Sequence, residues 1–173
     1  MAKLIILRGN SGSGKSVAAK RLQEKFGSNT MRISHDMIRM EMLHVWSREG
    51  IQRSLPLMME LLRYGREHSQ VTILEGILSA KEYAPLFELA VMLFGGNLHA
   101  YYYDLPFEET LRRHRTKPNC DEFGEAEMRN WWLEKDYLPM IEEAKLTRED
   151  GLEETVERIY REVMEDGFME EER

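Results

Sequence analysis

Short apolar runs alternate along this chain with longer stretches in which apolar residues recur every three to four positions. Continuous runs are typical of parallel strands buried on both faces, and the recurring pattern is typical of helices with one buried side. Strands are predicted at Leu4–Leu7, Thr30–Ser34, Val71–Leu74, Leu98–Tyr103 and Ala144–Thr147. The alternation predicts an α/β fold of three layers, a five-stranded, mainly parallel sheet flanked by helices, with right-handed crossovers.

The helical stretches lie between these strands and after the last one. They are predicted at Lys15–Phe26, Met37–Leu43, Ile51–Leu62, Leu86–Phe94, Phe107–Thr116, Met128–Trp132 and Leu152–Val163, the last one opened by a capping box of Asp150 and Glu153. Residues 45–50 and 117–124 are predicted loops, and the acidic tail 165–173 is predicted to fray. We expect a single domain over residues 1–173, with a small helical lid at about 112–130.

A glycine-rich segment joins the first predicted strand to the first predicted helix. It consists of Gly9, Asn10, Ser11, Gly12, Ser13, Gly14, Lys15 and Ser16, and its spacing G-x-x-x-x-G-K-S matches a phosphate-binding loop. Its backbone N–H groups and the helix start can hold a polyphosphate. Lys15 is predicted to reach the β- and γ-phosphates of ATP, and Ser16 to offer its hydroxyl to Mg²⁺. The alternative is a glycine-rich turn that binds no ligand.

Asp36 and Arg39 follow the second predicted strand. A carboxylate at this strand end can accept the proton of an acceptor hydroxyl and orient it for in-line attack. Arg39 lies about one helical turn further on, where it can share a face with Asp36 and bind an anionic group of the acceptor. The alternative role of Asp36 is to cap the following helix.

Glu75 ends the third predicted strand. In phosphate-loop enzymes this strand often supplies the carboxylate that orders Mg²⁺ and its waters. We therefore assign Glu75 to Mg²⁺ indirectly and count it among the substrate-binding candidates. The alternative is an ordinary carboxylate at a strand end.

A basic run, Arg112 to Lys117, begins on a predicted helix and leads into a polar loop. Phosphoryl transfer spreads negative charge over the transferred oxygens, so a movable lid that carries arginines is expected. Arg112 and Arg115 are three residues apart and can share a helical face. The alternative is a solvated basic face.

Composition narrows the choice of partner and compartment. The 173 residues carry a net charge of −7, which disfavours a long nucleic acid as partner because phosphate contacts dominate that affinity. Cys120 is the one cysteine, which is consistent with a reducing, cytoplasmic location. Apolar runs are too short to cross a bilayer, and the first strand leaves no room for a signal peptide.

The phosphate loop, the segment Ser34–Arg39 and the run Arg112–Arg115 together resemble small P-loop kinases. The most similar patterns are those of the 5′-kinase domain of polynucleotide kinase, the zeta-toxin kinases and the gluconate-kinase-like enzymes. In polynucleotide kinase the motif after strand two has an aspartate as base and, three residues later, an arginine on the acceptor phosphate, and Asp36 and Arg39 match that spacing. Ser34 and His35 stand where that pattern has Asn-Arg.

The resemblance also implies a lid arginine that stabilises the transition state. It would be one of Arg112, Arg113 and Arg115, and we favour Arg115 as the catalytic residue, with Arg112 on the nucleotide. The region from Met37 to Leu62 would build most of the acceptor pocket.

The sequence therefore predicts an ATP- and Mg²⁺-dependent kinase that phosphorylates a hydroxyl of a small acceptor such as a nucleoside, nucleotide or sugar derivative. The alternatives are a nucleotide-sugar kinase of the zeta-toxin type, a 5′-polynucleotide kinase and, from another class, a switch that hydrolyses ATP and signals through a partner. The sequence leaves the oligomeric state open.

Overall fold

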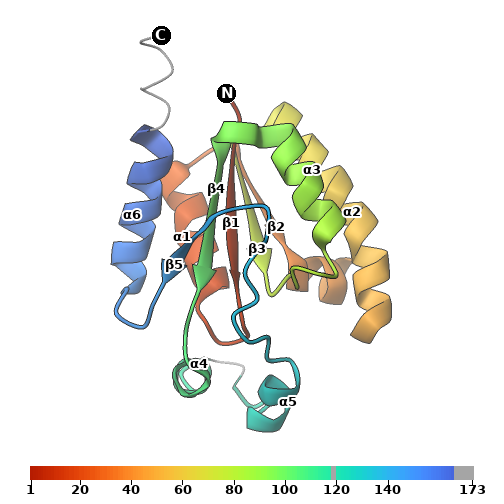
Figure 1. The fold of residues 1–173 in the computed structure, drawn as a ribbon, viewed down its shortest axis with the longest axis vertical. Coiled ribbons are helices and arrows are strands. Elements are labelled where there is room, and N and C mark those ends of the chain that lie inside the picture. The colour runs from red at the N-terminus through yellow and green to blue at the C-terminus, as the bar shows by residue number, and fades with distance from the viewer. Residues whose placement is uncertain (118–119, 166–173) are drawn as a thin grey trace.

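The computed structural model describes residues 1–117 and 120–165, and its centre is a five-stranded parallel sheet (Figure 1). The strand order is β2-β3-β1-β4-β5. The strands are β1 Lys3–Gly9, β2 Thr30–Ser34, β3 Val71–Gly76, β4 Leu98–Tyr103 and β5 Glu143–Leu146. The prediction of a three-layer α/β fold is confirmed, and β5 begins one residue before the predicted strand.

Two pairs of helices cover the two faces of the sheet. On one face α1 packs against α6, and on the other α2 packs against α3 (Figure 1). The helices are α1 Lys15–Phe26, α2 Ser47–His68, α3 Ala84–Phe94 and α6 Leu152–Glu165, with a short 3-10 helix η2 at Gly95–Asn97.

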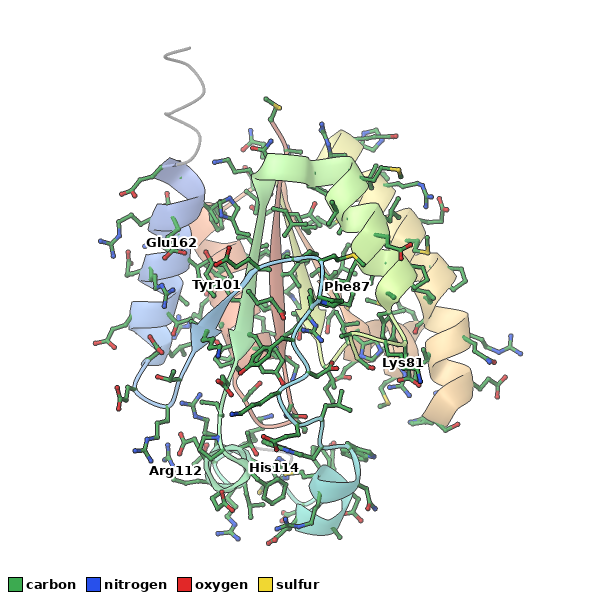
Figure 2. All side chains as sticks on the ribbon, in the orientation of Figure 1. Lys81, Phe87, Tyr101, Arg112, His114 and Glu162 are labelled. Carbon is green, nitrogen blue, oxygen red and sulfur yellow. The ribbon has the colours of Figure 1, made fainter. Side chains whose placement is uncertain are left out.

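Strand β1 shows how the sequence builds both layers of core. Successive side chains of a strand point to opposite faces. Leu4 and Ile6 accordingly lie in the core under α2 and α3, and Ile5 and Leu7 lie in the core under α1 and α6. All four are fully buried, which explains why this strand is an uninterrupted apolar run. On β4, Tyr101 donates a hydrogen bond of 2.6 Å to Glu162 and so ties α6 to the sheet (Figure 2).

The segment after β2 is a π-helix, η1, at Met37–Met42, where the sequence predicted an ordinary helix. The wider turn is seen in the bond of 2.9 Å from the N–H of Leu43 to the carbonyl of Ile38, five residues earlier. Short π-helical turns are rare and are often found at functional sites. α2 begins at Ser47, so most of the loop predicted at 45–50 is helical.

Two short helices, α4 at Phe107–His114 and α5 at Glu125–Asn130, lie below the carboxyl ends of the strands (Figure 1). The predicted lid, at about 112–130, takes in the end of α4 and all of α5, and its residues 118 and 119 lie outside the described residues. α4 ends two residues before the predicted Thr116, and Trp131 and Trp132 lie beyond α5. The tail predicted to fray, 165–173, lies outside the described residues from 166 onward.

The predicted capping box of α6 was wrong by one residue. Glu154 accepts the N–H of Gly151, whereas the carboxylate of Asp150 accepts the N–H and the hydroxyl of Thr147. The carboxylate of Asp150 is already used in the turn at Thr147, and α6 begins at Leu152 as predicted.

The chain returns from α5 to β5 through residues 131–142, which contain neither helix nor strand. Arg8, at the carboxyl end of β1, is fully buried and fastens this segment to the sheet. It donates to both carboxylate oxygens of Glu143 over 2.8 and 3.0 Å, and to the carboxylate and the carbonyl of Asp136 over 2.7 and 2.8 Å. The segment is thereby held beside the phosphate loop that follows β1.

Within residues 1–117 and 120–165, no helix combines the length and the apolar composition that a membrane span requires.

Candidate active site

The carboxyl ends of three neighbouring strands bring together Lys15, Asp36 and Glu75. Lys15 follows β1, Asp36 follows β2 and Glu75 lies near the end of β3, and the strand order β2-β3-β1 makes these ends adjacent. Burial lowers the pKa of Lys15, and the nearby carboxylates of Asp36 and Glu75 oppose that shift. One ammonium and two carboxylates that were predicted separately therefore share one site.

The phosphate loop needs glycine where it touches α4. Gly12 has a φ of +80°, and a Cβ added there would lie 2.4 Å from the carbonyl oxygen of Thr110 in α4. Only glycine permits both the positive φ and this close approach. At the end of the loop, Gly14 precedes α1 with a φ of +102°.

Within the phosphate loop, Asn10 and Lys15 have hydrogen-bond partners, whereas the Ser13 hydroxyl has none among the described residues. The Asn10 amide donates to the carbonyl of Leu133 and accepts the N–H of the same residue, each over 2.8 Å, so its side chain anchors the loop to residues 131–142. Lys15 Nζ donates to the carbonyl of Asn10 over 3.1 Å. The Ser13 hydroxyl is buried and has no partner among the described residues. What Asn10 can offer a phosphate is therefore its backbone N–H.

Ser16 and Glu75 meet directly: Ser16 Oγ donates to Glu75 Oε2 over 2.9 Å. On its other side the Glu75 carboxylate, only 2% exposed, faces Arg32 Nη1 at 3.4 Å. A hydroxyl and a carboxylate are the hard oxygen donors that Mg²⁺ prefers. The sequence analysis did not single out Arg32. The signal that could have found it is that Arg32 is a charged residue inside a short predicted strand.

The residues present fit a Mg²⁺ ion that arrives with a nucleotide. Among residues 1–117 and 120–165, no group of three or more His, Cys, Asp or Glu side chains could hold a metal by itself. Mg²⁺ typically takes one or two protein oxygens together with substrate phosphates and waters. Ser16 and Glu75 supply such a pair.

Asp36 and Arg39 have different surroundings, although the sequence predicted that they share a helical face. The Asp36 side chain is 62% exposed and makes no hydrogen bond as a helix cap. Arg39 Nη2 donates to the carbonyl of Ser47 over 3.1 Å, and its guanidinium lies against Gly50 in the first turn of α2. Asp36 precedes the π-helix η1 and Arg39 lies within it, where side chains three residues apart diverge more in direction than in an α-helix.

Of the predicted lid arginines, Arg113 contacts the phosphate loop. Its Nη1 donates to the carbonyl of Ser13 over 2.8 Å, and its Nε donates to Glu109 over 2.7 Å. Arg112 is exposed at the side of α4 and is paired with Glu109 (Figure 2). Arg115 caps the end of α4 through its backbone, and its side chain is exposed.

Lys117 is a further cation of the lid that sequence reasoning did not assign to the site. Burial lowers the pKa of Lys117, Lys15 lowers it further, and Asp36 and Glu75 raise it. Its ammonium is therefore close enough to Lys15, Asp36 and Glu75 for their charges to affect its pKa. The available signal was its position four residues after Arg113 in the same basic run.

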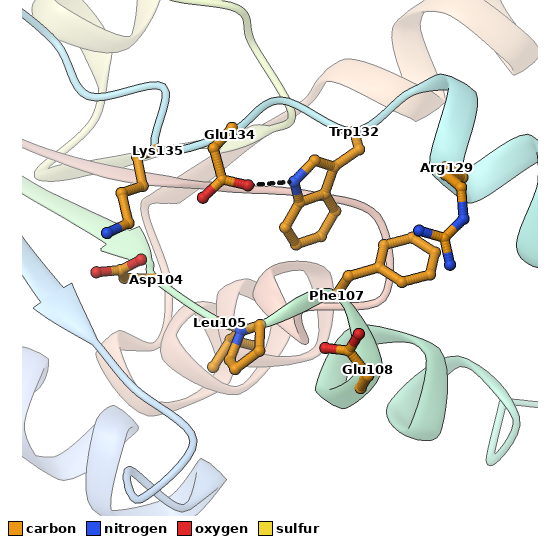
Figure 3. A pocket seen from close by; sticks show the side chains of 9 residues that line it. Asp104, Leu105, Phe107, Glu108, Arg129, Trp132, Glu134 and Lys135 are labelled. Carbon is orange, nitrogen blue, oxygen red and sulfur yellow. Dashed lines mark hydrogen bonds between the residues drawn. The ribbon is translucent and has the colours of Figure 1, made fainter.

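A separate cavity of about 650 Å³ opens between the start of α4 and residues 129–135 (Figure 3). In its wall the Trp132 indole N–H donates to Glu134 over 2.9 Å, and the Arg129 guanidinium lies 4.2 Å from the centre of the Phe107 ring. Its other lining residues are Asp104, Leu105, Pro106, Glu108 and Lys135. Since Lys15, Asp36 and Glu75 do not line it, this cavity is not the site described above.

No protein-family model matches the sequence, and no curated protein matches it. Among solved structures, the chain is similar to the APS kinase of Mycobacterium tuberculosis in complex with AMPPNP and APS, with 18% identity, 95% of this chain and 98% of that chain covered, and a TM-score of 0.68. It is similar to a gluconokinase from Sinorhizobium meliloti 1021, with 16% identity, 97% of each chain covered and a TM-score of 0.66.

A third similar structure is the shikimate kinase from Acinetobacter baumannii in complex with shikimate, with 16% identity, 96% of this chain and 95% of that chain covered, and a TM-score of 0.64. At these identities the likeness is one of fold. The chain has the fold of the P-loop kinases, which confirms the predicted fold class and the predicted resemblance.

Proposed function

We propose that this protein is a kinase that transfers the γ-phosphoryl group of ATP to a hydroxyl group of a small acceptor. The observation that carries the proposal is the buried Lys15 ammonium beside the carboxylates of Asp36 and Glu75. A triphosphate needs a cation, and an attacking hydroxyl needs a base. The site offers both at the carboxyl edge of a parallel sheet, where ligands of such folds bind.

The phosphate loop and the lid would hold the triphosphate from two sides. The loop N–H groups and Lys15 would bind the phosphate oxygens, and Ser16 and Glu75 would hold Mg²⁺. When bound, Mg²⁺ would neutralise charge on the β- and γ-phosphates. Arg113 and Lys117 would add positive charge from the lid, where negative charge develops on the transferred group.

Asp36 would prepare the acceptor. Its carboxylate is exposed and makes no helix-cap hydrogen bond, so it is free to accept a hydrogen bond from an incoming hydroxyl. In that position it would orient the oxygen for in-line attack and take its proton as the bond to phosphorus forms. A switch that only hydrolyses ATP has no need of a base dedicated to a second substrate.

The acceptor is proposed to be small. The similar structures include kinases named for APS, gluconate and shikimate, and the net charge of −7 disfavours a long nucleic acid. The acceptor would approach Asp36 from the side of η1 and α2, where Met40, Met42 and Trp46 expose 41%, 54% and 50% of their surfaces. A nucleoside, a nucleotide or a sugar derivative has both a hydroxyl and an apolar face for such a surface.

The test is ADP release from ATP and Mg²⁺ with a panel of nucleosides, nucleotides, sugars, nucleotide sugars and a 5′-hydroxyl oligonucleotide. We expect one class to stimulate ADP release, and the phosphorylated product to form in equal amount. Lys15→Ala should abolish this activity, and Lys20→Ala, on the exposed side of α1, should retain it. ADP release that no acceptor stimulates would support a switch, and stimulation by the oligonucleotide alone would support a 5′-polynucleotide kinase.

A further inference from the structure

Behind Asp36 lies a buried chain of three polar side chains from three parts of the fold. His35 follows β2, Tyr83 precedes α3 and Ser54 belongs to α2, and they are 4%, 1% and 0% exposed. His35 Nε2 and the Tyr83 hydroxyl are 2.5 Å apart, and the Tyr83 hydroxyl and Ser54 Oγ are 3.2 Å apart. The other ring nitrogen of His35, Nδ1, has no partner among the described residues and lies 3.9 Å from Asp36 Oδ1.

His35 is a neutral ring in these surroundings. Burial lowers its pKa to about 4, with Asp36 opposing the shift and Arg39 and Lys15 adding to it. A neutral imidazole has one nitrogen that donates and one that accepts. Burial also raises the pKa of Tyr83, so its hydroxyl keeps its proton.

Two orders of hydrogen-bond donation are compatible with these contacts. In the first, Tyr83 donates to His35 Nε2, and the ring proton is on Nδ1. In the second, His35 Nε2–H donates to Tyr83, Tyr83 donates to Ser54, and Ser54 donates to the carbonyl of Ile51 at 3.3 Å.

The charge of Asp36 distinguishes these two orders. In the second order the lone pair of Nδ1 faces a carboxylate oxygen, which is repulsive, whereas in the first an N–H faces it. The charge therefore favours the proton on Nδ1.

We propose that His35 is a positioning residue for Asp36: Tyr83 fixes the imidazole with its proton on Nδ1, and that N–H holds the carboxylate in the orientation that receives the acceptor hydroxyl. The inference rests on the proposed function of Asp36. The separation of 3.9 Å is longer than a hydrogen bond, and rotation of the exposed Asp36 side chain closes it when the acceptor binds. Hydrogen bonds of catalytic groups commonly tighten in this way on substrate binding.

A purely structural histidine does not account for the unpartnered nitrogen. A buried donor that is left without a partner costs stability, so most buried polar groups are paired. Nδ1 is unpaired on the side where the proposed base lies, and it acquires its partner once Asp36 turns toward it.

The first test reads the ring directly and needs no acceptor. Long-range ¹H–¹⁵N spectra of the ¹⁵N-labelled protein at neutral pH show which nitrogen of each histidine carries the proton. We expect His35 to carry it on Nδ1, and Asp36→Asn to shift the population toward the Nε2–H form. A wild-type His35 with its proton on Nε2 would overturn the proposal, because Nδ1 would then have nothing to donate.

The second test separates the two nitrogens by substitution. Asn places an amide nitrogen near the position of Nδ1, and Gln places one near the position of Nε2. We expect His35→Gln to lower the kcat of acceptor phosphorylation by about 10²-fold, the cost of a reacting group misplaced by about 1 Å. His35→Asn should restore most of that loss, and the Kd for ATP should stay unchanged in both.

His68→Gln is the matched control, because His68 lies exposed at the end of α2. Equal kcat values for His35→Gln and His35→Asn would overturn the positioning role even if both proteins fold normally. If the wild-type protein phosphorylates no acceptor, the proposed function fails. The tautomer and its response to Asp36→Asn still decide whether His35 and Asp36 are coupled.

Discussion

Ser16 Oγ donates a hydrogen bond of 2.9 Å to Glu75 Oε2 and joins the first turn of α1 to the end of β3. The two residues are 59 positions apart, and the parallel pairing of β1 with β3 brings them together. The bond holds a hydroxyl and a carboxylate where one Mg²⁺ ion can use both. It therefore links the phosphate loop to the metal chemistry proposed for the site.

Glu75→Gln should weaken the use of Mg²⁺ while sparing the phosphate loop. Gln retains an oxygen for the Ser16 hydroxyl but loses the charge, so the Mg²⁺ concentration for half-maximal activity should rise by on the order of tenfold or more. Titrations of activity with Mg²⁺ and of ATP binding without Mg²⁺ measure the two effects. Glu82→Gln, at an exposed position, is the control, and an unchanged Mg²⁺ requirement in Glu75→Gln would contradict the assignment.

Asp36→Asn should separate phosphoryl transfer from ATP binding. Transfer to the acceptor should fall by about 10²–10⁴-fold, the span typical of losing a positioned base. ATP affinity, background hydrolysis and the free energy of unfolding should change little, because the side chain is exposed and caps no helix. Equal losses in transfer and in background hydrolysis would mean that Asp36 serves the nucleotide or the metal instead.

Arg113→Ala and Arg115→Ala form a matched pair on one lid. Since Arg113 reaches the carbonyl of Ser13 and Arg115 is exposed, we expect Arg113→Ala to lower kcat by on the order of 10²-fold. Arg115→Ala should retain nearly normal kcat. Steady-state kinetics with saturating ATP measure both, and the reverse order would return the catalytic role to Arg115, as the sequence suggested.

His35 should make the protein sensitive to acid. Burial lowers the pKa of His35 to about 4, against an ordinary value of 6.5. Between these two pH values the unfolded chain therefore binds a proton that the folded protein does not bind. The free energy of unfolding should therefore fall as the pH drops from 6.5 to 4, by roughly 3 kcal/mol in all. Urea unfolding at a series of pH values should show this slope in the wild type and in His68→Gln, and a smaller slope in His35→Gln.

Arg8→Met should be strongly destabilising. It leaves the carboxylates of Glu143 and Asp136 without their cation, and breaking a buried ion pair typically costs about 3–5 kcal/mol. The exposed pair of Arg53 and Glu49 is the control, because Arg53→Met should cost less than about 1 kcal/mol. Denaturant unfolding compares the two, and similar small losses would show that residues 131–142 do not depend on Arg8.

Much of the fold and several of the candidate site residues follow from local sequence patterns. The apolar runs Leu4–Leu7 and Val71–Leu74 predicted β1 and β3, because a strand buried on both faces must be apolar throughout. The spacing of Gly12, Lys15 and Ser16 predicted the phosphate loop because one short turn carries all of its groups. That Asp36 and Glu75 lie near each other was predictable, because the ends of parallel strands meet at one edge of the sheet.

Only the tertiary structure decided which cations and which supporting groups belong to that edge. Arg113 contacts Ser13 across 100 positions of sequence, and His35 meets Tyr83 across 48. Arg32 faces Glu75 from another strand, and Lys117 lies near Lys15, Asp36 and Glu75, and both relations depend on how the segments pack. A local pattern records which side chains one segment presents, whereas such contacts depend on how several segments pack together.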